Sequence, residues 1–150
     1  MTDSTLQLIE LQRPYTFKSP FGGAEFAAWV VAEDASSSNE ELTGLAEELV
    51  SSGCRYAVCS GHECSKWDDA VDWAYLASCP DYRPEDHNFV MTTWHASETL
   101  AEIAFFFANH TKFDEFVPLR FVVVSVGAGP HAPLAFDEAK VCLANAQPNA

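Results

Sequence analysis

Residues 26–32 read FAAWVVA, seven apolar residues without a polar interruption. Such a run, rich in β-branched and aromatic side chains, predicts a strand buried on both faces, as found inside a parallel sheet. Residues 119–126, LRFVVVSV, predict a second strand of this kind. Both runs are far shorter than the roughly 20 apolar residues of a membrane-spanning helix. The sequence therefore predicts the core of a globular sheet protein.

Helical patterns lie between the predicted strands. Ser38 and Glu41 have the spacing of a capping box, and apolar residues then recur at helical intervals until Gly53. A second capping box is predicted at Ser65 and Asp68, and Ser97 is predicted to cap a third helix. The other predicted elements are a helix over 42–50, a strand over 55–60, a helix over 67–75, a strand over 88–94, a helix over 100–108 and a final helix over about 136–146.

Strands that alternate with helices are typical of βαβ units, which form parallel sheets. We predict an α/β fold: a single three-layer domain with a mainly parallel sheet of four to five strands (βαβαβαβ) and helices on both faces. An extra antiparallel strand or hairpin is predicted from residues 5–20 at one edge. The domain spans residues 1–150, with its core at about 24–127, an N-terminal extension at 1–23 and a C-terminal segment at 128–150.

Charge is the most unusual property of the chain. It has 22 acidic and 8 basic residues, a formal charge of −14, while 48% of its residues are hydrophobic. The hydrophobic content excludes a disordered chain, and the charge disfavours nucleic acid and anionic membranes as partners. Residues 33–102 hold 15 acidic and 3 basic residues, which predicts an acidic face that attracts a basic protein partner. The predicted binding residues are Asp34, Asp68, Asp69, Asp72 and Trp73.

A second kind of site is predicted where the strands end, because ligands of open parallel sheets bind beyond the carboxyl ends of the strands. Cys64 lies there, close to the start of a helix whose dipole favours a thiolate, and His62 or His95 would act as its base. These three are the candidate catalytic residues. Against this interpretation, the carboxylates of Glu63 and Asp68 would raise the pKa of the thiol.

A metal-binding alternative uses Cys59, His62 and Cys64, with His95 as a fourth ligand. The C-x2-H-x-C spacing is not a common zinc motif, so no metal is predicted. The phosphate-binding patterns G-x-x-x-x-G-K-[ST] and G-x-G-x-x-G are absent, and Pro130 removes a backbone donor from the glycine-containing turn at 127–130. We therefore expect no cofactor.

Three segments carry a resemblance to a family: CSKWDDAVDWA at 64–74, MTTWH at 91–95 and ETLAE at 98–102. Together they resemble a family of small bacterial α/β proteins of unassigned function, over roughly residues 55–126. That resemblance implies no activity or ligand. In size, charge and fold class the chain is also similar to small toxin-neutralising immunity proteins such as barstar, without a residue correspondence that would carry over a binding site.

Two functions remain open. The first is a non-enzymatic acidic interaction protein, an immunity- or antitoxin-like inhibitor of a basic partner. The alternative is a small-molecule enzyme or sensor with its Cys/His site at the carboxyl rim of the sheet. No basic region precedes an apolar segment at the N-terminus, and five cysteines are an odd number. We therefore expect a cytoplasmic protein with reduced thiols.

Overall fold

Five parallel strands form one sheet in the order β1-β5-β2-β3-β4 in the computed structural model, which describes residues 4–84 and 89–146. The strands are β1 (Thr5–Leu11), β2 (Phe26–Ala32), β3 (Cys54–Gly61), β4 (Met91–His95) and β5 (Arg120–Val126). The helices are α1 (Asn39–Ser51), α2 (Cys64–Ser78), α3 (Leu100–Asn109) and α4 (His131–Ala144), with a short 3-10 helix at Pro80–Tyr82.

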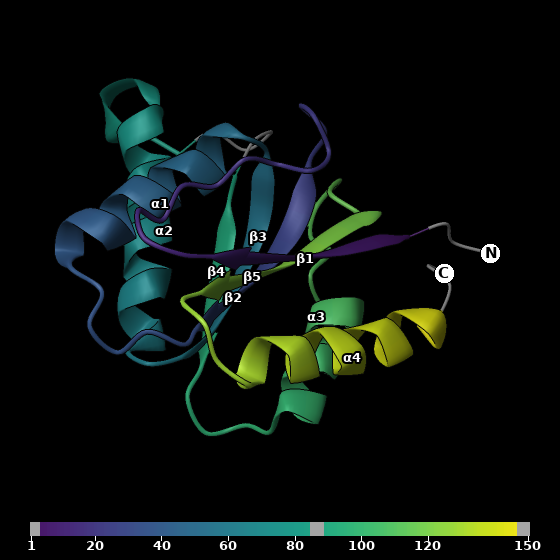
Figure 1. Cartoon of the computed structure of the whole chain (residues 1–150). Coiled ribbons are helices and arrows are strands. Elements are labelled where there is room, and N and C mark those ends of the chain that lie inside the picture. Colours follow the sequence, from purple (N-terminus) through teal and green to yellow (C-terminus); the bar gives the residue numbers. More distant parts are fainter. Residues whose placement is uncertain (1–3, 85–88, 147–150) are drawn as a thin grey trace.

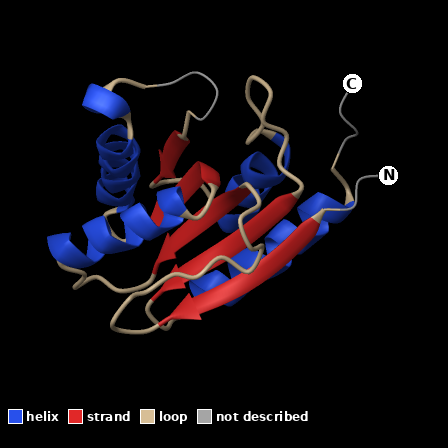
Figure 2. Cartoon of the chain, turned by 90° about the horizontal axis from the view of Figure 1, so that it is seen from above, coloured by secondary structure: helices blue, strands red, loops and turns tan. Residues whose placement is uncertain are grey.

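The direction of each crossover decides which face a helix covers. From β2 the chain moves through β3 to β4, and α1 and α2 lie together on one face of the sheet (Figure 1). It then returns past β3 and β2 to β5, so α3 covers the opposite face, where α4 joins it. Right-handed crossovers in opposite directions place helices on opposite faces. The result is the predicted three-layer α/β architecture (Figure 2).

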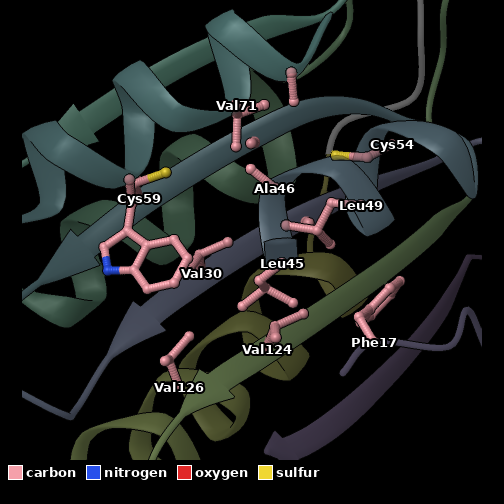
Figure 3. Packing of buried hydrophobic residues seen from close by; sticks show 14 of the residues in the cluster. Phe17, Val30, Leu45, Ala46, Leu49, Cys54, Cys59, Val71, Val124 and Val126 are labelled. Carbon is pink, nitrogen blue, oxygen red and sulfur yellow. The ribbon is translucent and has the colours of Figure 1, made fainter. Parts of the chain in front are cut away.

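Each face of the sheet has its own apolar core. The core under α1 and α2 contains Val30, Leu45 and Val71, all completely buried, and Figure 3 shows them with Cys54 and Cys59. The other core, under α3 and α4, is built around Trp29, whose Nε1 donates a hydrogen bond to Oγ of Ser60 at 2.8 Å. The alternation of strand side chains between the two cores explains why 26–32 is apolar throughout.

The N-terminal strand differs from its prediction. β1 pairs with β5 at the sheet edge, and the two run parallel, so the predicted antiparallel strand or hairpin is wrong. Residues 12–25 cross β5 to reach β2 and bury Tyr15 and Phe17 in the core under α1. The alternating sequence of β1 is compatible with parallel and with antiparallel pairing. The parallel direction follows from the connection over residues 12–25, which is long enough to cross β5 and is partly buried.

Strand and helix positions otherwise follow the sequence closely, and the differences lie at helix starts. The Ser38–Glu41 capping box is confirmed. The Ser65–Asp68 box is wrong, because α2 begins at Cys64 without a side-chain cap. The cap of α3 is Thr99, not Ser97, and it forms a capping box with Glu102. The strand predicted over 88–94 corresponds to β4, which begins at Met91. The first predicted residue, 88, lies outside the described ranges.

The last helix begins five residues earlier than predicted, at His131 instead of Phe136. Its first N–H groups are satisfied by the carboxylate of Glu33, 98 residues away in the sequence, and a cap from so distant a residue leaves no local pattern. In the part of the chain that the structure describes, no helix combines the length and apolar character needed to cross a bilayer.

Candidate functional site

Three carboxylates gather on α2 where it lies over the edge strand β4. Ligand oxygens of Asp68, Asp69 and Asp72 all lie within 4.8 Å of one another. Asp68 and Asp72 are one helical turn apart, and Oγ1 of Thr92 on β4 donates a hydrogen bond to Asp72 at 2.8 Å. These three aspartates and Trp73 form the acidic surface of the protein.

The acidic surface concentrates negative charge. Among the described residues Oδ1 of Asp68 is buried and accepts no hydrogen bond, although a hydrogen bond from Thr92 and the nearby His95 favour the charged form of this carboxylate. Burial raises the pKa of Asp68 and of Asp72 above the ordinary value, and the negative charge of Asp69 adds to both increases. The nearest basic residue in the sequence, Lys66, pairs with Glu63 at 3.0 Å. The carboxylates are therefore held together at an electrostatic cost.

Aromatic side chains border the same region. The exposed fraction of Trp73 is 67%, whereas that of Trp67, on the core side of the helix, is 1%. Trp94 on β4 is 51% exposed. β4 is an edge strand, so among residues 4–84 and 89–146 no strand pairs with one side of its backbone. Large exposed indole rings beside an open strand edge are features of protein-binding surfaces.

Asp34, also predicted to bind a partner, is surrounded by groups of its own chain. It accepts hydrogen bonds from the hydroxyl of Tyr15 and the backbone N–H of Ser36 (2.8 Å), and it lies 2.9 Å from Nη2 of Arg13. The hydrogen bond from Tyr15 is the main reason that its pKa falls to about 2. Burial, together with the bond to Asp34, raises the pKa of Tyr15 to about 12. The charge of Asp34 is already compensated in the folded chain.

Cys64, the predicted nucleophile, is the first residue of α2 and is 3% exposed. Burial raises the pKa of its thiol above the ordinary value, more than the backbone N–H groups of His95 and of the helix start lower it. Glu63 before it has a left-handed backbone, with φ of 49°. The structure thus places Cys64 where the sequence put it, in surroundings that favour the neutral thiol.

The two predicted base residues line a pocket that does not include Cys64. This rim pocket, of about 370 Å³, lies at the carboxyl ends of β2, β3 and β4 and is bordered by Glu33, Ser60, His62, His95, Glu98 and His131. His95 is buried, with Nδ1 against the carboxylate of Glu98 and Nε2 2.9 Å from Oγ1 of Thr93. His62 is exposed at the mouth. Cys64 itself does not line this pocket, although its thiol lies against the backbone N–H of His95.

The ligand atoms of the metal-binding alternative are also apart. No three of Cys59, His62, Cys64 and His95, all of which belong to the described ranges, bring their ligand atoms within 4.8 Å of one another. Cys59 is completely buried in the core under α1 and α2, where desolvation raises the pKa of its thiol (Figure 3). His62 lies instead on the rim.

One pair of residues at the carboxyl rim, Glu33 and His131, was not predicted from the sequence. The carboxylate of Glu33, 4% exposed, accepts hydrogen bonds from the backbone N–H groups of His131 (2.7 Å) and Ala132 (3.0 Å), and Nδ1 of His131 lies 2.7 Å from Oε1. A Cβ atom on Gly129 would lie 2.5 Å from the carboxyl carbon of Glu33, so this approach requires glycine. The Gly-Ala-Gly-Pro turn at 127–130 was the sequence feature that could have indicated this contact. The group that it approaches is a carboxylate of the protein itself and not a bound ligand.

Glu33 and His131 occupy the position at which doubly wound sheets often bind phosphate. Strand order reverses between β2 and β5, and both Glu33 N and Asp34 N donate to the carbonyl of Val126 there. The Glu33 carboxylate occupies the N-terminus of α4, which would otherwise attract an anion. The open space lies beside this point, in the rim pocket.

Fold and site together define an open, doubly wound α/β protein with an acidic helix at one edge and a histidine-lined pocket at the carboxyl rim. The chain belongs to the family described as domain of unknown function DUF7684, whose model matches residues 6–145. The resemblance to a family of unassigned function is thereby confirmed, while a bacterial origin stays a prediction. No curated protein and no solved structure matches the chain.

Proposed function

We propose that the protein binds a basic protein partner through the acidic surface on α2, and that this binding inhibits the partner in the manner of an immunity or antitoxin protein. The observation that carries the proposal is the buried, unpartnered Oδ1 of Asp68 among three adjoining carboxylates. A lysine or arginine of the partner would place a positive charge beside the three carboxylates and reduce their mutual repulsion. Association would therefore relieve a cost that the free protein carries.

The surroundings of the carboxylates support a protein partner. Trp73 offers a large apolar side chain that can be buried at low entropic cost, and Trp94 offers another on β4. The free edge of β4 can receive an extended segment by backbone hydrogen bonding. Asp34 is left out of the proposed interface because Arg13 and Tyr15 already satisfy it.

We further propose that the protein acts in the cytoplasm. All five cysteines are free thiols, and four of them are buried. Reducing compartments preserve such thiols, whereas an oxidising one would expose Cys142, the least buried, to oxidation. Fractionation of the source cells tests this proposal, because recovery of the protein outside the cytoplasmic fraction would contradict it.

The interface is tested with a charge-matched pair of variants. One carries Asp68→Asn, Asp69→Asn and Asp72→Asn. The control carries three changes at exposed residues outside the acidic surface: Glu40→Gln, Glu47→Gln and Asp137→Asn. Each protein is immobilised, exposed to extract of the source cell and eluted with increasing salt. Since both variants lose the same charge, a partner that recognises the acidic surface is retained by the wild type and the control but not by the first variant.

The salt dependence and the Trp73→Ala variant complete the test. We expect elution of the partner to depend strongly on salt, because exposed ion pairs are screened within about 10 Å at 0.1 M. Trp73→Ala should weaken binding by at least about tenfold, the range of an interface hot spot. Retention that is equal on both triple variants, or indifferent to salt, would contradict the proposal.

A further inference from the structure

The rim pocket differs in chemistry from the acidic surface. Three histidines border it, His62, His95 and His131, and none of its lining residues is a lysine or an arginine. Its volume of about 370 Å³ falls within the range of small-molecule sites.

His131 lines the pocket and has a ring nitrogen that can accept a hydrogen bond from a ligand. Its Nδ1 faces the carboxylate of Glu33, and a carboxylate that already receives two backbone N–H groups can only accept there. The proton of the neutral imidazole is therefore on Nδ1, and Nε2 keeps a free lone pair. Among the described residues no hydrogen bond engages Nε2, and the side chain is 63% exposed.

The other two histidines have different roles. Both ring nitrogens of His95 are engaged, one by Glu98 and the other by Thr93, so this residue forms a fixed wall. Its ring also packs against Phe106, with centroids 4.9 Å apart. His62 is exposed at the mouth and borders the entry. His131 is consequently a histidine of the pocket with a ring nitrogen that can accept a hydrogen bond from a ligand.

The charges around the pocket indicate what kind of molecule fits. The N-terminus of α4 is taken by Glu33, and that of α3 by the capping box of Thr99 and Glu102. Neither helix start is thus open to a phosphate or carboxylate, and the side chains of Glu33 and Glu98 would repel one. An anionic ligand is disfavoured, whereas an uncharged donor matches Nε2.

We propose that the rim pocket binds an uncharged small molecule, whose O–H or N–H group donates a hydrogen bond to Nε2 of His131. Glu33 is the positioning residue, because it fixes both the tautomer and the orientation of the ring. Val31, Ala32 and Leu100 supply the apolar part of the wall. This site is independent of the acidic surface, so either proposal can fail without the other.

The test uses three pairs of defined probes that differ by a negative charge: nicotinamide and nicotinate, ribose and ribose 5-phosphate, cytidine and cytidine 5′-monophosphate. Each is titrated into ¹⁵N-labelled protein, and amide signals of Gly61 and Ala96 are followed by NMR. We expect at least one uncharged probe to shift these signals and its anionic counterpart to bind at least about tenfold more weakly. Failure of all three uncharged probes, or equal binding of an anionic counterpart, would overturn the proposal.

Two variants and one spectroscopic signature test the role of His131. His131→Ala should weaken binding of the active probe by about tenfold or more, whereas His110→Ala, outside the pocket, should leave it unchanged. Ring ¹⁵N shifts should place the proton of neutral His131 on Nδ1 in the wild type, and Glu33→Gln should make the two tautomers more equal in population. Unchanged binding in His131→Ala, or a proton on Nε2 in the wild type, would contradict the inference.

Discussion

Two groups of carboxylates in this protein have opposite surroundings. Glu33 and Asp34, at the end of β2, accept hydrogen bonds from α4, Tyr15 and Ser36, and Arg13 lies beside Asp34. The aspartates of α2 face one another, and Oδ1 of Asp68 has no partner. The first group stabilises the fold. The second carries raised pKa values, so its negative charge opposes folding.

The largest expected effect is that of removing Glu33. Glu33→Ala leaves two N–H groups at the start of α4 without their acceptor, so we expect the free energy of unfolding to fall by about 2–3 kcal/mol. Denaturant unfolding at pH 7 measures this change. Asp69→Ala, which removes a carboxylate from the other group, is the control and should stay within about 0.5 kcal/mol. An equal loss in the free energy of unfolding in both variants would contradict the conclusion that only the carboxylates at the end of β2 stabilise the fold.

Asp34 comes next, and its effect depends on pH. Its pKa in the folded protein is about 2, below the ordinary value of 3.8, so its contribution is complete above about pH 4 and is lost as the pH falls toward 2. Asp34→Asn should lower stability by roughly 1–2 kcal/mol at pH 7 and less at pH 2. Chemical unfolding at several pH values tests this. A loss that is constant over this range would contradict the prediction.

Asp68 should show the opposite sign. Because its pKa is raised in the folded protein, the ionised form opposes folding at neutral pH, and protonation relieves this as the pH falls through the folded pKa. Asp68→Asn is therefore expected to raise the free energy of unfolding by about 1 kcal/mol or less at pH 7, with a smaller gain in acid. Asp137→Asn, at an exposed residue of α4, serves as the control. A destabilised Asp68→Asn variant would show that this carboxylate supports the fold.

The smallest change in stability is expected for Trp73→Ala. This side chain is 67% exposed, so its loss should alter the free energy of unfolding by no more than about 0.5 kcal/mol. The same variant is expected to weaken partner binding, which separates a binding role from a structural one. Thermal or chemical unfolding checks the first part, and a destabilisation above about 2 kcal/mol would assign Trp73 to the packing of α2.

The sequence predicted most elements because their causes are local. Residues 26–32 match β2 in full, and the Ser38–Glu41 box begins α1 as expected. Trp73, predicted from the sequence as a binding residue, is exposed at the surface of its helix. Periodicity and capping depend on residues a few positions apart, which a single sequence displays.

Features with distant causes were missed. The direction of β1 depends on how residues 12–25 cross the sheet, and the start of α4 depends on Glu33. Cys64 was placed correctly beside a helix start, but burial, which the sequence pattern does not display, outweighs the backbone N–H groups there and raises its pKa. His131 carried no pattern that distinguished it from other surface histidines.

The sequence by itself determined the α/β class, the inner strands and the concentration of negative charge on residues 33–102, because composition and periodicity are properties of neighbouring residues. Tertiary structure alone decided which carboxylates are compensated. Arg13, Tyr15 and the start of α4 reach the end of β2 only when the sheet assembles, whereas Oδ1 of Asp68 accepts no hydrogen bond in the described part of the chain. The same kind of negative charge therefore stabilises the fold at the end of β2 and opposes it on α2.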